Sequence, residues 1–169
     1  ERGNFILDTG VPTIVLNETD RLIEEGVAIG IGAGGQETQL SEGEIASFQL
    51  AGIEQGEQAT LGLDLSGLAQ RSERELLGIM GYDQLREYEL LIDYQESAFY
   101  LLPARRNELH NSQDPVYSLN FEYLDHLPVI VLRQGNKRLY FAIDTGAGTN
   151  LIDPKALESG LVASPTADL

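Results

Sequence analysis

The sequence predicts a mainly β protein with a few short helices, and three observations support this fold class. Short runs of β-branched, aliphatic and aromatic residues alternate with glycine and polar turns along most of the 169 residues. Helical patterns are few and short. An Asp-Thr-Gly tripeptide lies between apolar runs at residues 8–10 and again at 144–146. We therefore expect strands arranged in two related units.

Strands joined by glycine-rich turns are expected over the first hundred residues. NFIL and TIVL flank the first Asp-Thr-Gly, and VAIGIGAGG, EIASFQLAG and ATLGLDL follow as strand-like runs. YELLIDY and SAFYLLP predict a tight hairpin that turns at QE. A helix is predicted over 17–26, with Asn17 as its N-cap and Gly26 as its stop, and GYDQLREY could form two helical turns. These elements make up a first unit, residues 1–103.

A second unit is expected at residues 116–169. The polar stretch 104–115 lacks a clear period and predicts a linker. LPVIVLRQGNKRLYFAID then predicts a hairpin with QGNK as its turn. A short helix is predicted at 153–160, because Asp153 suits the N-cap, Pro154 the first helical position and Gly160 the stop.

The two Asp-Thr-Gly sequences belong to a longer repeat. When Asp8 is aligned with Asp144, an offset of 136 residues, Val15 falls on Leu151 and the two predicted helix starts coincide. A strand, a turn, a second strand and a helix recur in the same order. The repeat therefore predicts two units of one design.

An aspartate at the end of a buried strand has two interpretations. A single Asp-Thr-Gly indicates an Asx turn, in which Asp caps the turn and Gly takes positive φ. Two copies in equivalent contexts favour a functional pair, because facing carboxylates cannot both ionise cheaply and share one proton. Such a pair can hold a water molecule, activate it for attack on a peptide carbonyl and protonate the developing oxyanion. Asp8 and Asp144 are therefore candidate catalytic residues.

The residues after each aspartate suit this chemistry. The hydroxyl groups of Thr9 and Thr145 can hold the two loops together. Gly10 and Gly146 have no Cβ, so the backbone can approach the carboxylates closely.

At these residues the chain resembles the aspartic proteases, and within them the retropepsin-like bacterial group. ILDTGV and AIDTGA are similar to the active-site segments of the family's two lobes, and LLG at 76–78 is similar to its later hydrophobic-hydrophobic-Gly. The glycine-rich run 28–39 lies where the family has a flap. The resemblance covers most of residues 4–103 and restarts near 116.

The resemblance implies retropepsin-like acid protease lobes and an aspartic endopeptidase that needs no cofactor or metal. It makes Asp8 and Asp144 catalytic, and Thr9, Gly10, Thr145 and Gly146 supporting residues. A peptide or protein substrate would bind under a flap that includes Gly30, Ile31, Gly32, Ala33 and Gly34. Bacterial proteins of this kind are often exported, so the resemblance also implies a periplasmic or extracellular location.

The chain departs from the family pattern in three places. Val11 stands where Ala or Ser is usual, so no hydroxyl group can bond to the carboxylate there. The first unit is expected to lack its opening strand, and the second unit its flap and closing segment. We therefore expect either a second copy of the chain or further lobe segments to complete the site. The pairing of Asp8 with Asp144 in one chain stays open, as does an alternative function as a non-catalytic peptide-binding or assembly module.

Composition excludes several other classes of function. The net charge of −16 argues against nucleic acid as a partner, and no apolar run of 18 or more residues predicts a membrane span. The absence of cysteine excludes thiol catalysis, and the two histidines do not have a metal-binding spacing. GIGAGG at 30–35 fits a dinucleotide fingerprint, but no amphipathic helix follows it, which favours a hairpin tip. The aromatic residues of the strand-like runs are expected in the core or on strand faces, with a peptide cleft as the alternative.

Overall fold

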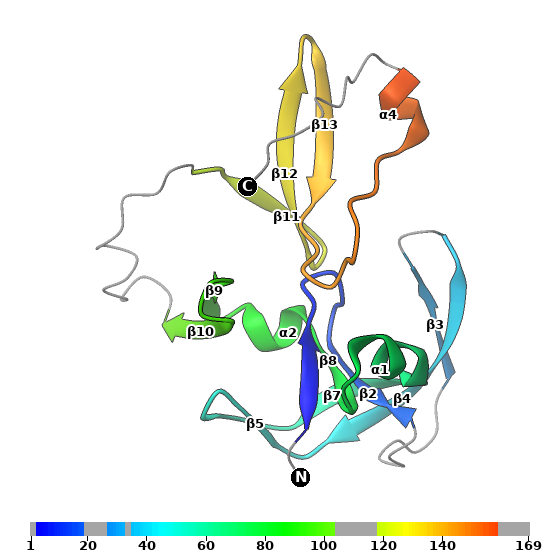
Figure 1. The fold of residues 1–169 in the computed structure, drawn as a ribbon, viewed down its shortest axis with the longest axis vertical. Helices are drawn as coiled ribbons and strands as arrows, with labels where there is room; N and C mark the ends of the chain where they lie inside the picture. Colours follow the sequence, from blue (N-terminus) through cyan, green and yellow to red (C-terminus); the bar gives the residue numbers. More distant parts are fainter. Residues whose placement is uncertain (1–2, 19–26, 33–34, 104–117, 159–169) are drawn as a thin grey trace.

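A computed structural model describes residues 3–18, 27–32, 35–103 and 118–158. Strands dominate these ranges, which confirms the mainly β class (Figure 1). The predicted linker at 104–115 lies outside the described residues. So do Ala33, Gly34 and nearly all of the helix predicted over 17–26.

The first unit contains a six-stranded sheet in the order β1-β8-β2-β7-β4-β3. Its strands are β1 (Asn4–Leu7), β2 (Ile14–Asn17), β3 (Val27–Ile31), β4 (Glu37–Ile45), β7 (Gln58–Leu63) and β8 (Leu76–Met80). β8 lies between β1, to which it is parallel, and β2, to which it is antiparallel. The two strands that flank the first Asp-Thr-Gly are therefore held apart by β8. Within the described residues the sheet is open at β1 and at β3.

Gly78 allows β8 to fit between its two neighbours. A Cβ atom at this position would overlap the carbonyl oxygen of Val15 and lie 2.7 Å from the Phe5 ring. Beside this crossing, Val15, Leu65 and Ile79 form a buried apolar cluster. Full burial of such side chains contributes roughly 1.5–3 kcal/mol each, so the crossing is also the centre of the unit's core.

Smaller elements surround this sheet. They are the hairpin β5 (Phe48–Leu50) and β6 (Ile53–Gln55), helix α1 (Ser66–Ser72), helix α2 (Tyr82–Leu85), and the hairpin β9 (Tyr88–Asp93) and β10 (Ala98–Pro103). The β9–β10 hairpin was predicted and is confirmed. α2 is a single turn where two were predicted, and α1 was not predicted at all.

Asn17 has a role in the sheet that its sequence pattern does not indicate, whereas the helix it was predicted to cap lies almost wholly outside the described residues. Asn17 is the last residue of β2 and is only 8% exposed. Its side-chain amide donates to the carbonyl oxygen of Leu76 at 3.0 Å and accepts from the N–H of Leu65 at 3.1 Å. The side chain therefore joins β2 to β8 and to the start of α1.

The second unit contains a three-stranded antiparallel sheet of β11 (Phe121–Leu124), β12 (Leu127–Gln134) and β13 (Lys137–Ala142). The predicted hairpin is confirmed, with its turn at 135–136. The last described element is helix α4 (Pro154–Glu158), which begins as predicted, because Asp153 Oδ1 accepts the N–H of Lys155 at 2.9 Å. None of the described helices has the length and apolar character needed to cross a lipid bilayer.

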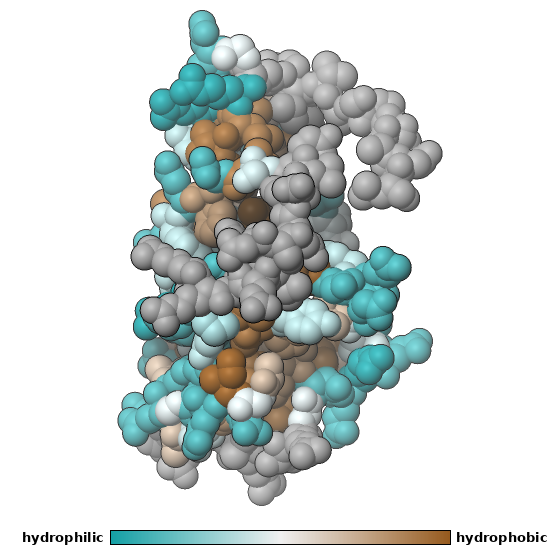
Figure 2. Space-filling model, turned by 90° about the vertical axis from the view of Figure 1, so that its left-hand side faces the viewer, coloured by the Kyte–Doolittle hydropathy of each residue, from teal (hydrophilic) through white to brown (hydrophobic). Residues whose placement is uncertain are grey.

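Equivalent segments of the two units have different surroundings. Residues 14–17 form β2, buried between β7 and β8, whereas their repeat counterpart 150–153 is not in a strand. Val15 is 3% exposed, but its counterpart Leu151 is 67% exposed. Among the described residues no counterpart of β7 or β8 pairs with the second unit. Figure 2 views the molecule from the left-hand side of Figure 1 and shows apolar side chains in the upper part, where β12 and β13 lie.

Candidate active site

The two Asp-Thr-Gly loops meet between the units, near the centre of Figure 1. Asp8 directly follows β1, and its N–H donates to the carbonyl oxygen of Met80 in β8 at 3.0 Å. Asp144 follows β13 after Ile143, whose N–H donates to the carbonyl oxygen of Pro128 in β12 at 2.8 Å. Each loop is therefore held by the sheet of its own unit.

Four reciprocal hydrogen bonds of Thr9 and Thr145 join the loops. Each threonine N–H donates to the hydroxyl oxygen of the other threonine at 3.1 Å. The Thr9 hydroxyl donates to the carbonyl oxygen of Ile143 at 2.7 Å, and the Thr145 hydroxyl donates to that of Leu7 at 2.8 Å. The arrangement is nearly symmetric, as expected for a repeat, and it brings both loops together within one chain.

Each carboxyl group lies against the glycine of the opposite loop. A Cβ atom on Gly10 would lie 2.8 Å from Cγ of Asp144, and one on Gly146 would lie 2.7 Å from Oδ1 of Asp8. Only glycine fits at either position. The Asp8 and Asp144 side chains consequently approach closely enough to share a hydrogen bond.

Asp8 is held in its protonated form more readily than an ordinary aspartate. The pKa of Asp8 is raised from 3.8 to about 6, mainly by burial and also by the hydrogen bond and negative charge of Asp144. The N–H of Gly10, which donates to Asp8 Oδ1 at 2.8 Å, and the positive charge of His126 oppose this rise.

The two aspartates have unequal hydrogen-bond partners. Oδ1 of Asp144 accepts the N–H groups of Gly146 at 2.9 Å and Ala147 at 3.1 Å. The described residues give Oδ1 of Asp8 one such bond, from Gly10. The N–H of Val11 donates to the main-chain oxygen of Asp8 at 3.4 Å, whereas the N–H of Ala147 is shared between Oδ1 and the main-chain oxygen of Asp144, which is 3.3 Å away. Backbone N–H groups stabilise a carboxylate, so a single negative charge is better placed on Asp144.

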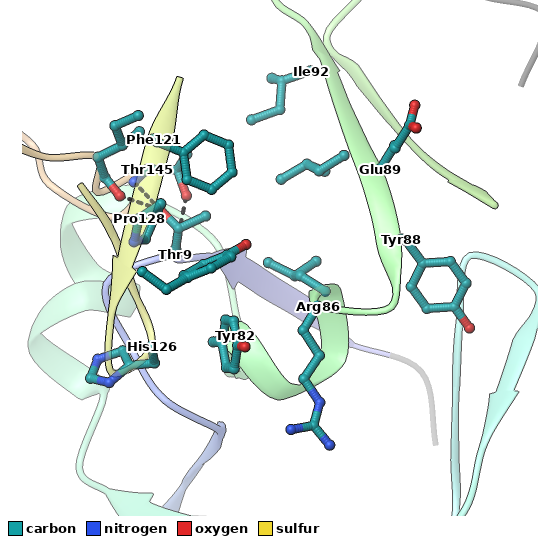
Figure 3. Close-up of a pocket in the computed structure, with 14 residues that line it drawn as sticks. Thr9, Tyr82, Arg86, Tyr88, Glu89, Ile92, Phe121, His126, Pro128 and Thr145 are labelled. Atoms are coloured by element: carbon teal, nitrogen blue, oxygen red, sulfur yellow. Dashed lines mark hydrogen bonds between the residues drawn. The ribbon is translucent and has the colours of Figure 1, made fainter. Parts of the chain in front are cut away.

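A cavity of about 530 Å³ adjoins the threonine pair (Figure 3). Thr9 and Thr145 line it, together with residues of α2, β9, β11 and β12, whereas the two aspartates do not. The rings of Tyr82 and Tyr123 meet edge to face across it, with centroids 5.2 Å apart. Phe121 and Tyr123 are about half exposed and line this cavity, so they lie on the face of β11 and not in the core.

The run expected to form a flap is a hairpin at the edge of the first sheet. Gly30 and Ile31 end β3, and Gly32 starts the turn that leads to β4. Ile29 and Ile31 are 69% and 72% exposed. Because GIGAGG is followed by the strand β4 and not by a helix, it does not have the form of a dinucleotide site.

No protein-family model matches the chain, and no curated protein or solved structure shows significant similarity to it. Among the described residues, no three histidine or acidic side chains are grouped so that they could hold a metal ion. The geometry of the two loops is therefore the main guide to function.

Proposed function

We propose that this protein is an aspartic endopeptidase built from retropepsin-like lobes. One observation carries the proposal: loops from two different units set two carboxyl groups against each other and are fixed there by the four threonine hydrogen bonds. Two facing carboxyl groups that share a proton can supply a base and an acid to one reaction.

The unequal surroundings of the aspartates assign their roles. Ionised Asp144 takes a proton from a water molecule whose oxygen attacks the carbonyl carbon of the scissile peptide bond. Asp8, with its pKa raised to about 6, gives its proton to the carbonyl oxygen, which produces a neutral tetrahedral diol. Asp144, now protonated, gives its proton to the amide nitrogen while Asp8 takes a proton from a hydroxyl group of the diol. The C–N bond breaks, a carboxylic acid and an amine are released, and the pair returns to its starting state.

The substrate proposed here is a peptide in extended conformation. The β3–β4 hairpin presents an exposed strand edge and the apolar side chains of Ile29 and Ile31, which suit pairing with a strand and contact with its side chains. Gly30, Ile31 and Gly32 would then belong to a flap over the bound peptide.

The working enzyme requires additional strands against the second unit. The exposed Leu151 has a buried counterpart, Val15, which is covered by β7 and β8 in the first unit. Strands of the β7 and β8 type, from a second copy or from further lobe segments, are proposed to cover Leu151 in the same way.

A cleavage assay from pH 3 to 8 on a denatured protein mixture tests the proposal. We expect a bell-shaped pH profile on the acid side of neutral, whose basic limb reports loss of the shared proton from the pair. Asp8→Asn and Asp144→Asn should each abolish cleavage, and a statine-type inhibitor should do the same. Asp64→Asn, an exposed aspartate outside the site, is the matched control and should leave cleavage unchanged. Cleavage retained in both site variants would end the proposal.

The exposed surface of the second unit also supports a non-catalytic peptide-binding or assembly module. Such a module would bind extended peptides and show no cleavage at any pH. It would also bind a statine-type inhibitor no better than a matched peptide without the hydroxyl group, because that group mimics the tetrahedral diol.

A further inference from the structure

His126 links the second unit to the catalytic loop of the first unit. It lies in the turn between β11 and β12, directly after Asp125, whose φ is +56°. Its Nε2 atom is 3.1 Å from the carbonyl oxygen of Gly10. Figure 3 shows the imidazole at the end of this turn, at the edge of the cavity. This contact is separate from the threonine hydrogen bonds.

Gly10 touches both carboxyl groups of the proposed pair. Its N–H donates to Asp8 Oδ1 at 2.8 Å, and its Cα faces the carboxyl group of Asp144 so closely that no Cβ would fit. A shift of Gly10 would therefore change the distance between Asp8 and Asp144. A hydrogen bond to the carbonyl oxygen of Gly10 therefore restrains both the position of Gly10 and the distance between the two aspartates.

We propose that His126 is a positioning residue, which donates from Nε2 to the Gly10 carbonyl oxygen and so holds the Asp8 loop against Asp144. The inference rests on the proposed function, because it concerns how that site is arranged. His126 does not touch the reacting atoms in this account. It acts through Gly10.

The Nε2 donor and the charge of His126 act on the same loop. A protonated imidazole donates from both nitrogens, so the bond to Gly10 no longer depends on the tautomer. Its positive charge also lowers the pKa of Asp8, against the effect of Asp144. The other ionisable groups around the adjoining cavity are Tyr82, Arg86, Tyr88, Glu89 and Tyr123. The Arg86 guanidinium lies 3.7 Å from Asp83 and from Glu87.

The test compares two substitutions of His126. In His126→Gln the amide nitrogen can occupy the place of Nε2 and donate to Gly10, but the side chain has no charge. In His126→Leu both the donor and the charge are lost. Lys137→Gln is the control, because it removes a cation at the far end of the β12–β13 hairpin (Figure 1).

Two measurements are made on each full-length variant. The first is the pH midpoint of the Asp8 carboxyl carbon signal in an NMR titration, assigned with Asp8→Asn. We expect it to rise by about half a pH unit in both His126 variants, because a nearby positive charge is lost, and to stay unchanged in Lys137→Gln. The second is kcat/KM for peptide cleavage, which we expect to fall about tenfold in His126→Leu and to stay within about twofold of wild type in His126→Gln.

Either of two results would overturn the inference. One is an Asp8 midpoint that is the same in wild type and both His126 variants. The other is an equal loss of kcat/KM in His126→Gln and His126→Leu, which would show that the donor to Gly10 has no role. If His126→Leu does not fold, the Asp8 midpoint and kcat/KM of His126→Gln remain decisive, and a tenfold loss there also contradicts the inference. Absence of cleavage in wild type would refute the proposed function, while the titration would still report on His126.

Discussion

The substitution Asp8→Asn should stabilise the fold at neutral pH while abolishing catalysis. Asn resembles the protonated form of Asp8: its oxygen can accept from Gly10 and its nitrogen can donate to Asp144. The folded-state pKa of Asp8 is raised to about 6 from 3.8, so the folded protein binds the proton more tightly than the unfolded chain. The stability that comes from protonated Asp8 is therefore fully present below pH 3.8 and is lost as pH rises through about 6.

The size of the effect follows from the pKa shift. A change from 3.8 to about 6 is about two units, and each unit corresponds to about 1.4 kcal/mol, which gives an upper limit of about 3 kcal/mol. Asp8 is only half-buried, so solvent screening reduces the expected gain for Asp8→Asn to about 1–2 kcal/mol at pH 7.5.

Urea unfolding of wild type and Asp8→Asn at pH 3 and pH 7.5 measures this gain. The difference between the two proteins at each pH isolates Asp8, because the other carboxyl groups are common to both. Asp64→Asn is a control in which the pKa shift has the opposite direction. The N–H of Ser66 donates to Asp64 at 2.9 Å, and hydrogen bonding to Ser66 lowers the pKa of Asp64. Asp64 stabilises the fold above its unfolded pKa and loses this effect as pH falls, so Asp64→Asn should be the less stable protein only at pH 7.5.

The reasoning fails if Asp8→Asn destabilises the protein equally at both pH values. That result would mean that ionising Asp8 costs no more free energy in the folded protein than in the unfolded chain. A gain of the same size at pH 3 and pH 7.5 would also contradict it, because a gain that originates in ionisation must disappear where Asp8 is protonated.

Three further predictions concern the contacts that hold the site. Thr9→Val removes the hydroxyl group that bonds to the carbonyl oxygen of Ile143 and to the N–H of Thr145, so urea unfolding should show a loss of about 1–3 kcal/mol for the two bonds, whereas Thr9→Ser should retain most of the wild-type stability. Gly78→Ala should cost about 3 kcal/mol by the same assay because β8 cannot accept a Cβ, whereas Gly56→Ala, with open space around it, should be nearly neutral. In this cysteine-free chain, Leu151→Cys should react rapidly with a maleimide and Val15→Cys slowly, and slower reaction of Leu151→Cys at high protein concentration would show that a second copy covers it.

The fold class and the two candidate loops could be predicted because the signals are local or repeated. The β9–β10 and β12–β13 hairpins follow from alternating apolar runs around short turns, and α4 begins at Asp153 as its capping pattern indicates. The two aspartates were singled out because the residues around them recur at a fixed offset. Their meeting within one chain could not be deduced, since hydrogen bonds between residues 136 apart leave no local trace in the sequence.

Other features depend on tertiary contacts that a sequence pattern does not contain. Asn17 has the side chain of a helix cap, but its burial beside β8 gives it partners in Leu76 and Leu65. The sequence does not single out His126, because its partner is a backbone carbonyl 116 residues earlier. The cavity beside Thr9 and Thr145 collects residues from several elements, and none of them forms a motif.

The two units show how much of the site depends on the surrounding sheets. Residues 14–17 and 150–153 share a pattern, yet only the first set becomes a buried strand, because β7 and β8 flank it. The loops nevertheless meet, because the bonds between Thr9 and Thr145 and the contact of His126 with Gly10 use only atoms close to the aspartates. Among the described residues, the contacts that join the two loops therefore do not depend on strands beside residues 150–153. The proposed strands against residues 150–153 should make the Asp144 loop more rigid. We expect them to raise kcat and stability, but they are not needed to bring the two aspartates together.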